Sequence, residues 1–439
     1  MNVPEGDIAK AGGCPFSGAF PADANSLTDA KVIAEPQKFY KAMRDNDPVY
    51  FDEKLGMYLV SRYEDVVEVL KDPITYSDKM GYDHMYGGPY REEFMQILER
   101  DGGGFFYDAI KDDPPAHTRV RRLLDKAFTA HRVATLEPGI RKVVIDLIDE
   151  MLDAGEGGEV VDGVTKFSVP VTIRIICEQL GIEHFNAEKI HRWSAAVTAQ
   201  ISGMQNRDSM LENARQICEL QNFIIAEMKA RENEPREDMI SDLVHARLED
   251  GSTLTFKEAV SLIRANIIAG NDTTATALSN LQFLLATRPD ILKKLQESVD
   301  DERQMNRFVE ELLRFAPPVQ GLAKMTIKEV ELGGKKLPAG AHLLVMYASG
   351  NDDETVFECP RDFDMQRPNI AKQVAFGTGV HRCIGAALAR MEIKVAAREL
   401  IRRIGKIELA VPANEVQYLP TVAVHGIKEL PLRLERRAV

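Results

Sequence analysis

The stretch "FGTGVHRCIG", residues 376–385, decides the fold, because it sets one cysteine among glycines at the expected start of a helix. Helix N-terminal N–H groups and the positive end of the helix dipole stabilise a thiolate. The glycines let the backbone approach a bulky planar cofactor, and His381 and Arg382 add positive charge. No second thiol is nearby, so Cys383 is a candidate axial ligand to a single metal centre such as haem iron.

A phosphate-binding loop is the alternative interpretation of the same glycines. The GxGxxG pattern requires a preceding strand and a βαβ unit, whereas Gly377 and Gly379 follow an irregular segment late in a helical chain. The chain also contains no GxxxxGK[ST] sequence. Both observations argue against a phosphate site.

The composition narrows the class of protein. Of the 439 residues, 44% are hydrophobic and 28% are charged, which is ordinary for a soluble globular protein. No run of about eighteen apolar residues occurs, and "MNVPEGDIAKAGG" has neither a basic start nor an apolar core, so we expect a cytoplasmic protein. The net charge of −13 argues against binding to nucleic acid or anionic membranes. The five cysteines form no CxxC pair, which argues against a zinc site or a disulfide framework.

The order of patterns predicts a mainly α protein with a minor β region. Residues 1–27 predict a loose tail, and residues 28–439 predict a single domain without repeats. Hairpins are expected over "VYFDEKLGMYLVSR" and around Gly333-Gly334. Residues 76–112, rich in Gly, Tyr, Phe and Met, predict a long loop acting as a lid over a ligand. Helices are expected before Pro48, before Pro73, and over 115–130, 133–153, 166–181, 187–202, 208–232, 236–247, 256–285, 288–316 and 384–402.

The segment "ANIIAGNDTTATALSN", residues 265–280, lies inside one of these expected helices. Its centre, "GNDTT", consists of poor interior helix residues. Thr and Asp side chains can bond to backbone carbonyls, so a bend or groove could bring a hydroxyl beside a carboxylate, as a proton relay requires. A helix-packing glycine with satisfied polar neighbours is the alternative.

Two further segments pair ionisable side chains on one helix face. "EELLRFAPPV" sets Glu311 three residues before Arg314, and "DPPAHTRVRRLL" sets His117 four residues before Arg121. His117 and Arg121 could together hold an anionic group. Taken alone, each pattern is more typical of an ordinary surface helix.

Together the four segments resemble the cytochrome P-450 haem-thiolate monooxygenases. "FGTGVHRCIG" fits the FxxGxHxCxG signature, and "AGNDTT" resembles the oxygen-activation motif of that family's long central helix. "EELLR" resembles its ExxR motif, and "HTRVR" the HxxxR motif with which bacterial members hold haem propionates. The likeness runs from about residue 36 to the C-terminus. It implies the fold of that family, mainly α with a minor β region and a long central helix over haem.

The resemblance also implies roles for the matching residues. Cys383 would bind the iron, with Phe376 packed near it, and Asp272 and Thr273 would pass protons during oxygen activation. Glu311 and Arg314 would form a structural ion pair behind the haem. The other residues implied to contact the haem are His117, Arg121, Ala269, Gly270, Lys324, Gly377, His381 and Gly385.

Two positions depart from the pattern of the family. Lys324 stands where bacterial relatives usually carry an arginine for a propionate, which keeps the charge but loses the bidentate fork. Asp362 stands where the family often has an arginine as the third partner of the ExxR pair. Either Arg361 or Arg367 could take that place.

The implied function is hydroxylation, or a related oxidation, of an apolar small molecule with O2, b-type haem and, indirectly, NAD(P)H. We expect electrons from a separate ferredoxin and its reductase, with docking on the basic segment 117–132 near Arg119, Arg122 and Lys126. We also expect a monomer without a membrane anchor. A haem-thiolate peroxygenase and a non-catalytic haem sensor are the alternatives. The Asp272-Thr273 pair argues against the first, and the lack of a recognisable signalling or DNA-binding segment argues against the second.

An apolar pocket, suited to a terpenoid, steroid, fatty or aromatic ligand, is the last expectation from the resemblance. Each lining residue has an equally plain interpretation as part of the core. The expected lining consists of Met85, Tyr86, Phe105, Phe106, Trp193, Val197, Ile201, Met204, Ile268, Ala269, Val319, Leu322 and Val422.

Overall fold

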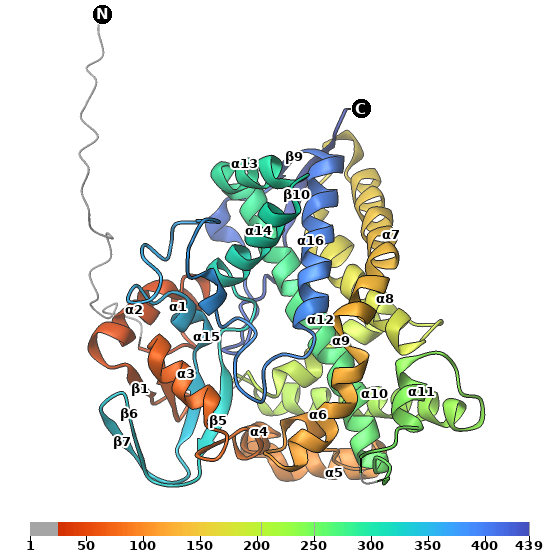
Figure 1. Cartoon of the computed structure of the whole chain (residues 1–439), viewed down its shortest axis with the longest axis vertical. Coiled ribbons are helices and arrows are strands. Elements are labelled where there is room, and N and C mark those ends of the chain that lie inside the picture. The colour runs from red at the N-terminus through yellow and green to blue at the C-terminus, as the bar shows by residue number, and fades with distance from the viewer. Residues whose placement is uncertain (1–24, 203, 250, 439) are drawn as a thin grey trace, which may run out of the picture.

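Helices surround one long helix, α12 (Phe256–Thr287), in the computed structural model, which describes residues 25–202, 204–249 and 251–438 (Figure 1). The start of α12 is fixed by a capping box, in which Thr255 accepts from the N–H of Glu258 and the Glu258 side chain accepts from the N–H of Thr255. The mainly α fold with a minor β region is confirmed.

The remaining helices are α1 (Ala30–Ala34), α2 (Gln37–Asn46), α3 (Tyr63–Lys71), α4 (Asp78–Met85), α5 (Arg91–Asp101), α6 (Ala116–Ala127), α7 (Ala130–Ala154), α8 (Val169–Leu180), α9 (Ala187–Ala199), α10 (Arg207–Asn233), α11 (Met239–Val244), α13 (Pro289–Ser298), α14 (Glu302–Phe315), α15 (Tyr347–Asn351) and α16 (Ala386–Arg403). Most of these helices match expected ones, whereas α1, α4, α5 and α15 were not expected.

The strands form three small sheets. The largest has the order β1 (Val49–Asp52), β2 (Met57–Val60), β8 (His342–Val345), β5 (Leu322–Thr326) and β3 (Tyr76–Ser77), and only its β2–β8 pair is parallel. The second has the order β4 (Val161–Asp162), β10 (Pro431–Arg436) and β9 (Ile404–Leu409). The third is the hairpin β6 (Val330–Leu332) and β7 (Lys335–Leu337), in which the φ angles of Gly333 and Gly334 are 56° and 78°, as the expected tight turn requires.

The core is organised around α12, which packs against α8, α9, α10 and α16. Ile263, Ile267, Leu278 and Leu281 of α12 are all at most 1% exposed. A Cβ atom added to Gly270 would come within 3.2 Å of Ile176 Cδ1, so glycine allows α8 to approach at this level. The helix stays continuous over 256–287, and the hydroxyls of Thr273 and Thr276 donate to the carbonyls of Ala269 and Asp272 within it.

The prediction of a long loop over residues 76–112 is wrong, because most of this segment is helical. Ser77 caps α4 by accepting from the N–H of Met80 at 3.0 Å. In α5, Phe94 and Leu98 lie four residues apart and both are buried. Local capping and apolar spacing therefore outweigh the high glycine content of the segment.

Two other boundaries differ from expectation. The helix expected over 288–316 is divided into α13 and α14, because the Asp301 carboxylate caps a new helix by accepting from the N–H groups of Arg303 and Gln304. Residues 1–24 of the expected tail lie outside the described residues. The tail does not extend to residue 27, since Ser26 donates to Asp52 at 2.8 Å and Leu27 is buried.

No helix within residues 25–202, 204–249 or 251–438 combines the length and apolar character needed to cross a membrane.

Candidate functional site

The loop 376–385 is folded tightly at the start of α16. Gly377 and Gly379 have φ angles of 63° and 74°, which L side chains rarely adopt. A Cβ atom on Gly379 would lie 2.3 Å from the carbonyl oxygen of Leu70, so only glycine lets the loop dock on the end of α3. The N–H of Cys383 closes the loop by donating to the carbonyl of Phe376 at 2.9 Å. The Phe376 ring packs against the Arg390 guanidinium, 4.4 Å away.

The Cys383 thiol is exposed within this loop. Desolvation by the surrounding protein raises its pKa, while the Gly385 N–H and the charges of Arg121, Lys111 and Arg390 act in the opposite direction. The buried cysteines Cys177 and Cys218 lack such a setting, and burial raises their pKa values to about 12 and about 11. Among the described cysteines, Cys383 alone has a backbone N–H donor and three cations to stabilise a thiolate.

Two histidines next to the loop have buried nitrogens without hydrogen-bond partners. The rings of His117 and His381 lie 4.1 Å apart, and His117 is 2% exposed. Both nitrogens of His117, and Nε2 of His381, make no hydrogen bond. Burial lowers the pKa of His117 and lowers that of His381 to about 3, so both rings are neutral at pH 7 and each can donate one N–H.

Arg121 and Lys324, the two cationic side chains expected to bind haem propionates, have different partners in the structure. Arg121 lies beside the loop, where its Nη1 donates to the carbonyl of Arg382 at 2.7 Å and its Nε to Asp125. Lys324 on β5 is buried and donates to the Asp78 carboxylate. Burial alone would raise the pKa of Asp78, but the charges of Lys324 and Lys111 lower it. Asp78 was not predicted from the sequence.

The expected acid and alcohol lie next to each other on α12. Both oxygens of the Asp272 carboxylate accept from hydroxyls on α9, from Ser194 at 2.8 Å and from Thr198 at 2.5 Å. Burial raises the pKa of Asp272, against the effect of these two donors. Thr273 donates to the carbonyl of Ala269 at 2.8 Å. Ala269 is exposed although it lies in the middle of a buried helix.

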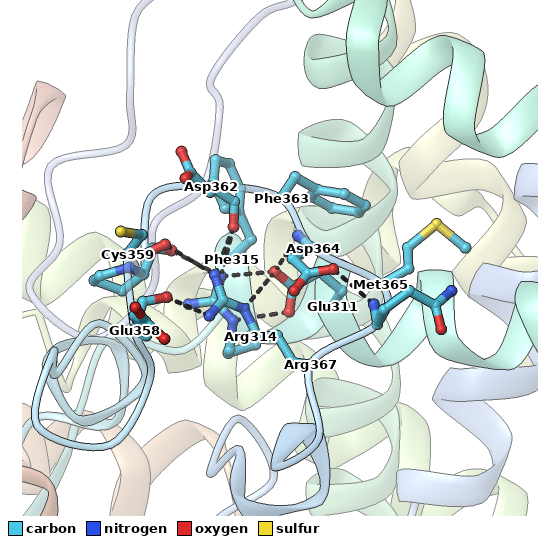
Figure 2. Close-up of polar contacts among 12 residues, drawn as sticks. Glu311, Arg314, Phe315, Glu358, Cys359, Asp362, Phe363, Asp364, Met365 and Arg367 are labelled. Atoms are coloured by element: carbon cyan, nitrogen blue, oxygen red, sulfur yellow. Dashed lines mark hydrogen bonds and ion pairs between the residues drawn. The ribbon is translucent and has the colours of Figure 1, made fainter. Parts of the chain in front are cut away.

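The ExxR residues form the centre of a fully buried cluster. Arg314 donates two hydrogen bonds of 2.8 Å to Glu311, and both side chains are 0% exposed. Arg367 completes the cluster, as Figure 2 shows: its Nε donates to Glu311 at 3.1 Å, and its other nitrogens donate to carbonyls of the 358–362 loop. Asp362 contributes its carbonyl rather than its side chain. Arg361 instead stacks on Phe315, 4.1 Å from the ring centre.

The expected pocket residues divide into two groups. Phe106 and Trp193 belong to the core: Phe106 packs on Phe256, and Trp193 packs on Phe223 of α10 and donates to Glu219. Tyr86, with its hydroxyl bonded to Asp108, packs on Phe105, and Val197 is also buried. Val422 is buried in a cluster that includes Met85 and Met204. The residues that remain partly exposed are Met85, Phe105, Ile201, Met204, Ile268, Val319 and Leu322.

The basic segment lies on α6, but two of its three expected docking cations are paired. Arg119 forms an ion pair with Glu258, and Arg122 with Glu249. Lys126 is exposed. The side chain of Arg382 is also exposed. Arg382 lies beside α6, since its carbonyl accepts a hydrogen bond from Arg121 of that helix.

Asp78, Ser194 and Thr198 were not predicted from the sequence as site residues. A signal existed for the last two: His191, Ser194 and Thr198 are spaced three and four residues apart and so share one face of α9. Asp78 had no comparable signal, because its partner Lys324 lies 246 residues away.

The donor set fits a haem group. Its thiol receives a backbone N–H, its glycines permit close approach, and His117 and His381 keep buried nitrogens without partners beside Arg121. An anionic group would satisfy these nitrogens. The described residues contain no group of three His, Cys, Asp or Glu residues that could hold a metal ion. A haem iron can be held by a single cysteine thiolate, which Cys383 could supply.

Comparisons with known proteins agree with this chemistry. The family model for cytochrome P-450 matches residues 54–405. The chain is 30% identical to the 6-deoxyerythronolide B hydroxylase of Saccharopolyspora erythraea, over 90% of this chain and 95% of that protein. It is 32% identical to the mycinamicin IV hydroxylase/epoxidase of Micromonospora griseorubida, over 93% of this chain and 96% of that protein. The structure of CYP109Q5 from Chondromyces apiculatus superimposes with a TM-score of 0.79 at 30% identity, covering 94% of this chain and 99% of that one. The chain belongs to the cytochrome P-450 family of haem-dependent monooxygenases.

Proposed function

We propose that this chain inserts one oxygen atom of O2 into an apolar small molecule, with Cys383 as the ligand of the haem iron. Haem b, when bound, supplies the activation of O2, with reducing equivalents that come from NAD(P)H through partner proteins. One observation carries the assignment of the ligand: the Cys383 thiol accepts from the Gly385 N–H and lies among three cations, beside two histidines with buried nitrogens that make no hydrogen bond.

The propionate groups would be held by the neighbouring side chains. The neutral rings of His117 and His381 can each donate one N–H, and Arg121 adds a full positive charge. The three groups come from α6 and from the cysteine loop, so a bound anion would fix these two elements relative to each other.

Proton supply would be the task of Asp272 and Thr273. Burial favours the protonated form of Asp272, and the hydroxyls of Ser194 and Thr198 favour the charged form, so the carboxyl group can both hold and release a proton. Thr273 is the adjacent hydroxyl on the helix surface where Ala269 is exposed. Both residues are proposed here as the acid and alcohol of oxygen activation.

The substrate would be apolar, because the partly exposed candidates for its pocket carry no charge. They are Met85, Phe105, Ile201, Ile268, Val319 and Leu322. Two relatives are named as hydroxylases of 6-deoxyerythronolide B and of mycinamicin IV, and we propose a bulky, mostly apolar substrate for this chain as well. Titration of candidate compounds, followed by the shift of the haem Soret band, would identify the class.

Electrons would come from a separate ferredoxin and its reductase in the cytoplasm. An acidic iron–sulfur protein would dock over α6, where Lys126 and Arg382 are exposed, with Arg119 and Arg122 contributing less because each already has an acidic partner.

The test is the ferrous–CO absorption band from which the family takes its name. We expect this band in the haem-loaded protein and its loss in Cys383→Ser, since a hydroxyl does not replace a thiolate ligand. Cys359→Ser is the matched control, because Cys359 is the other exposed cysteine among the described residues. A band that survives in Cys383→Ser would refute the proposed ligand.

A further inference from the structure

Asp78 lies where three segments of the proposed haem edge meet. Its Oδ2 atom accepts from Lys324 of β5 and lies 3.4 Å from Nε2 of His381 in the cysteine loop. Its N–H donates to Asp113 at 3.0 Å, just before α6, and the neighbouring Ser77 hydroxyl donates to the same carboxylate at 2.5 Å. The first residue of α4 is thus bonded to β5 and to the segment that leads into His117 and Arg121, and it adjoins the cysteine loop.

The charge of Lys324 is already compensated by this contact. The side chains of Lys324 and Asp78 are 3% and 5% exposed, so neither can turn to solvent. In a buried site, separating such a pair leaves an uncompensated charge, which is strongly unfavourable. Lys324 would therefore have to abandon a buried carboxylate to bind a propionate.

The backbone also fixes α4 at this point. A Cβ atom on Gly81 would come within 2.6 Å of the Cα atom of Lys324, so α4 rests directly on β5 beside the ion pair. The same helix ends at Met85, one of the partly exposed candidates for the substrate pocket. A single short helix therefore connects the haem edge to the proposed pocket.

We propose that Asp78 is a positioning residue that holds Lys324 in a neutral buried pair, so that Lys324 anchors α4 rather than a haem propionate. The proposal rests on the proposed haem site at Cys383. The propionates would then be bound by His117, His381 and Arg121. Lys324, at a position usually occupied by arginine, would instead pair with Asp78. Lysine suits that task because a single point charge satisfies one carboxylate oxygen.

The experiment compares the rates at which ferric haem passes from the protein to excess apomyoglobin. The variants are Lys324→Met, Asp78→Asn with Lys324→Met, and Arg121→Met. Lys324→Met leaves an unpaired buried carboxylate beside the propionates, so we expect haem to leave about tenfold faster. The double variant removes both charges together, and we expect its rate to return to within about twofold of wild type. Arg121→Met should release haem faster whichever residue is present at position 78.

The opposite pattern would overturn the proposal. If Lys324 binds a propionate, the single and double Lys324 variants will lose haem equally fast, as Arg121→Met does. Should Lys324→Met fail to fold, Lys324→Gln, which keeps a donor for Asp78, replaces it with the same criterion. Lys79→Met is the matched control, because Lys79 neighbours Asp78 but its pair with Asp112 is at the surface, and its rate should be unchanged.

Hydrogen exchange in the haem-free protein gives a second readout that a propionate ligand would not affect. We expect the amides of residues 78–85 to exchange faster in Lys324→Met than in wild type, and the double variant to recover protection. Equal exchange in wild type and Lys324→Met would contradict the anchoring role. Failure of the haem site itself would be recognised separately, because wild-type protein would then hold no haem to transfer.

Discussion

The ExxR cluster and the edge of the cysteine loop are both buried and polar, but they differ in how their hydrogen bonds are satisfied. In the cluster, Arg314 and Arg367 both donate to Glu311 and to loop carbonyls (Figure 2). At the edge of the loop, His117 and His381 keep buried nitrogens without partners. Because unpaired buried polar groups are costly, the first arrangement is complete as protein, whereas the second fits our proposal that a bound propionate supplies the missing partners. Whether the buried hydrogen bonds are satisfied therefore distinguishes a structural cluster from a candidate ligand site more clearly than burial or charge does.

Breaking the complete cluster should have the largest effect. Glu311→Gln leaves two buried arginines without a counter-charge, and we expect a loss of about 3–5 kcal/mol in the free energy of unfolding. Urea denaturation of the haem-free protein measures it. The control is Glu310→Gln, since Glu310 pairs with Arg390 at a partly exposed position and should cost less than about 1 kcal/mol. Equal losses in the two variants would show that the cluster has no special structural role.

Asp272 sharpens the comparison, because it is buried with its hydrogen bonds satisfied and yet is proposed to act in the reaction. Asp272→Asn keeps the size of the side chain but removes the transferable proton, so we expect turnover to fall about a hundredfold. Substrate affinity, measured from the Soret shift, should stay the same. The exposed pair of Arg288 and Asp290 provides the control variant Asp290→Asn. Unchanged turnover in Asp272→Asn would assign Asp272 to structure alone.

His425 is a partly buried histidine that does have a hydrogen-bond partner, since its Nε2 lies 2.9 Å from the carbonyl of Ile33. Burial lowers its pKa from 6.5 to about 4, so the unfolded chain binds a proton in this range that the folded chain does not. Its contribution to stability is therefore present above pH 6.5 and is lost as pH falls toward 4. We expect wild type to lose about 2 kcal/mol more than His425→Phe on acidification from about pH 7 to pH 5. Urea denaturation at the two pH values measures the difference, and parallel losses would contradict the assigned shift.

The smallest effect is expected on the exposed side of the haem edge. Lys126→Glu should slow reduction by an acidic ferredoxin about threefold at low salt, and the difference should disappear at high salt. Stopped-flow reduction measures the rate, with Lys142→Glu on α7 as a control of equal charge change. A salt-independent effect, or none, would place the docking surface elsewhere.

Much of the fold follows from local patterns, and so do the residues of the four motifs. Most helices of the second half and the two hairpins were predicted, because apolar spacing and turn residues are local features. The motif residues Cys383, Asp272 and Glu311 were also picked out from local sequence. The helices α4 and α5 were mistaken for a loop, since their glycines and aromatics obscured the cap at Ser77.

Pairings over long distances in the chain were not predictable. The choice of Arg367 over Arg361 depends on how the 358–367 loop wraps around Glu311, and the pairing of Lys324 with Asp78 depends on α4 resting on β5. Similarly, Trp193 was expected in the pocket, but its neighbours on α10 determine where its ring packs. Composition and spacing carry no information about such contacts.

The most direct test of the central claim measures the free energy of unfolding with and without haem for two variants. Glu311→Gln should lose stability in both forms, because its cluster is complete without haem. His117→Phe removes two unpaired buried nitrogens, so we expect the haem-free protein to be as stable as wild type or more so. The haem-loaded form of this variant should lose about 1–3 kcal/mol, because a propionate partner is gone. A loss for His117→Phe that is the same with and without haem would contradict the account.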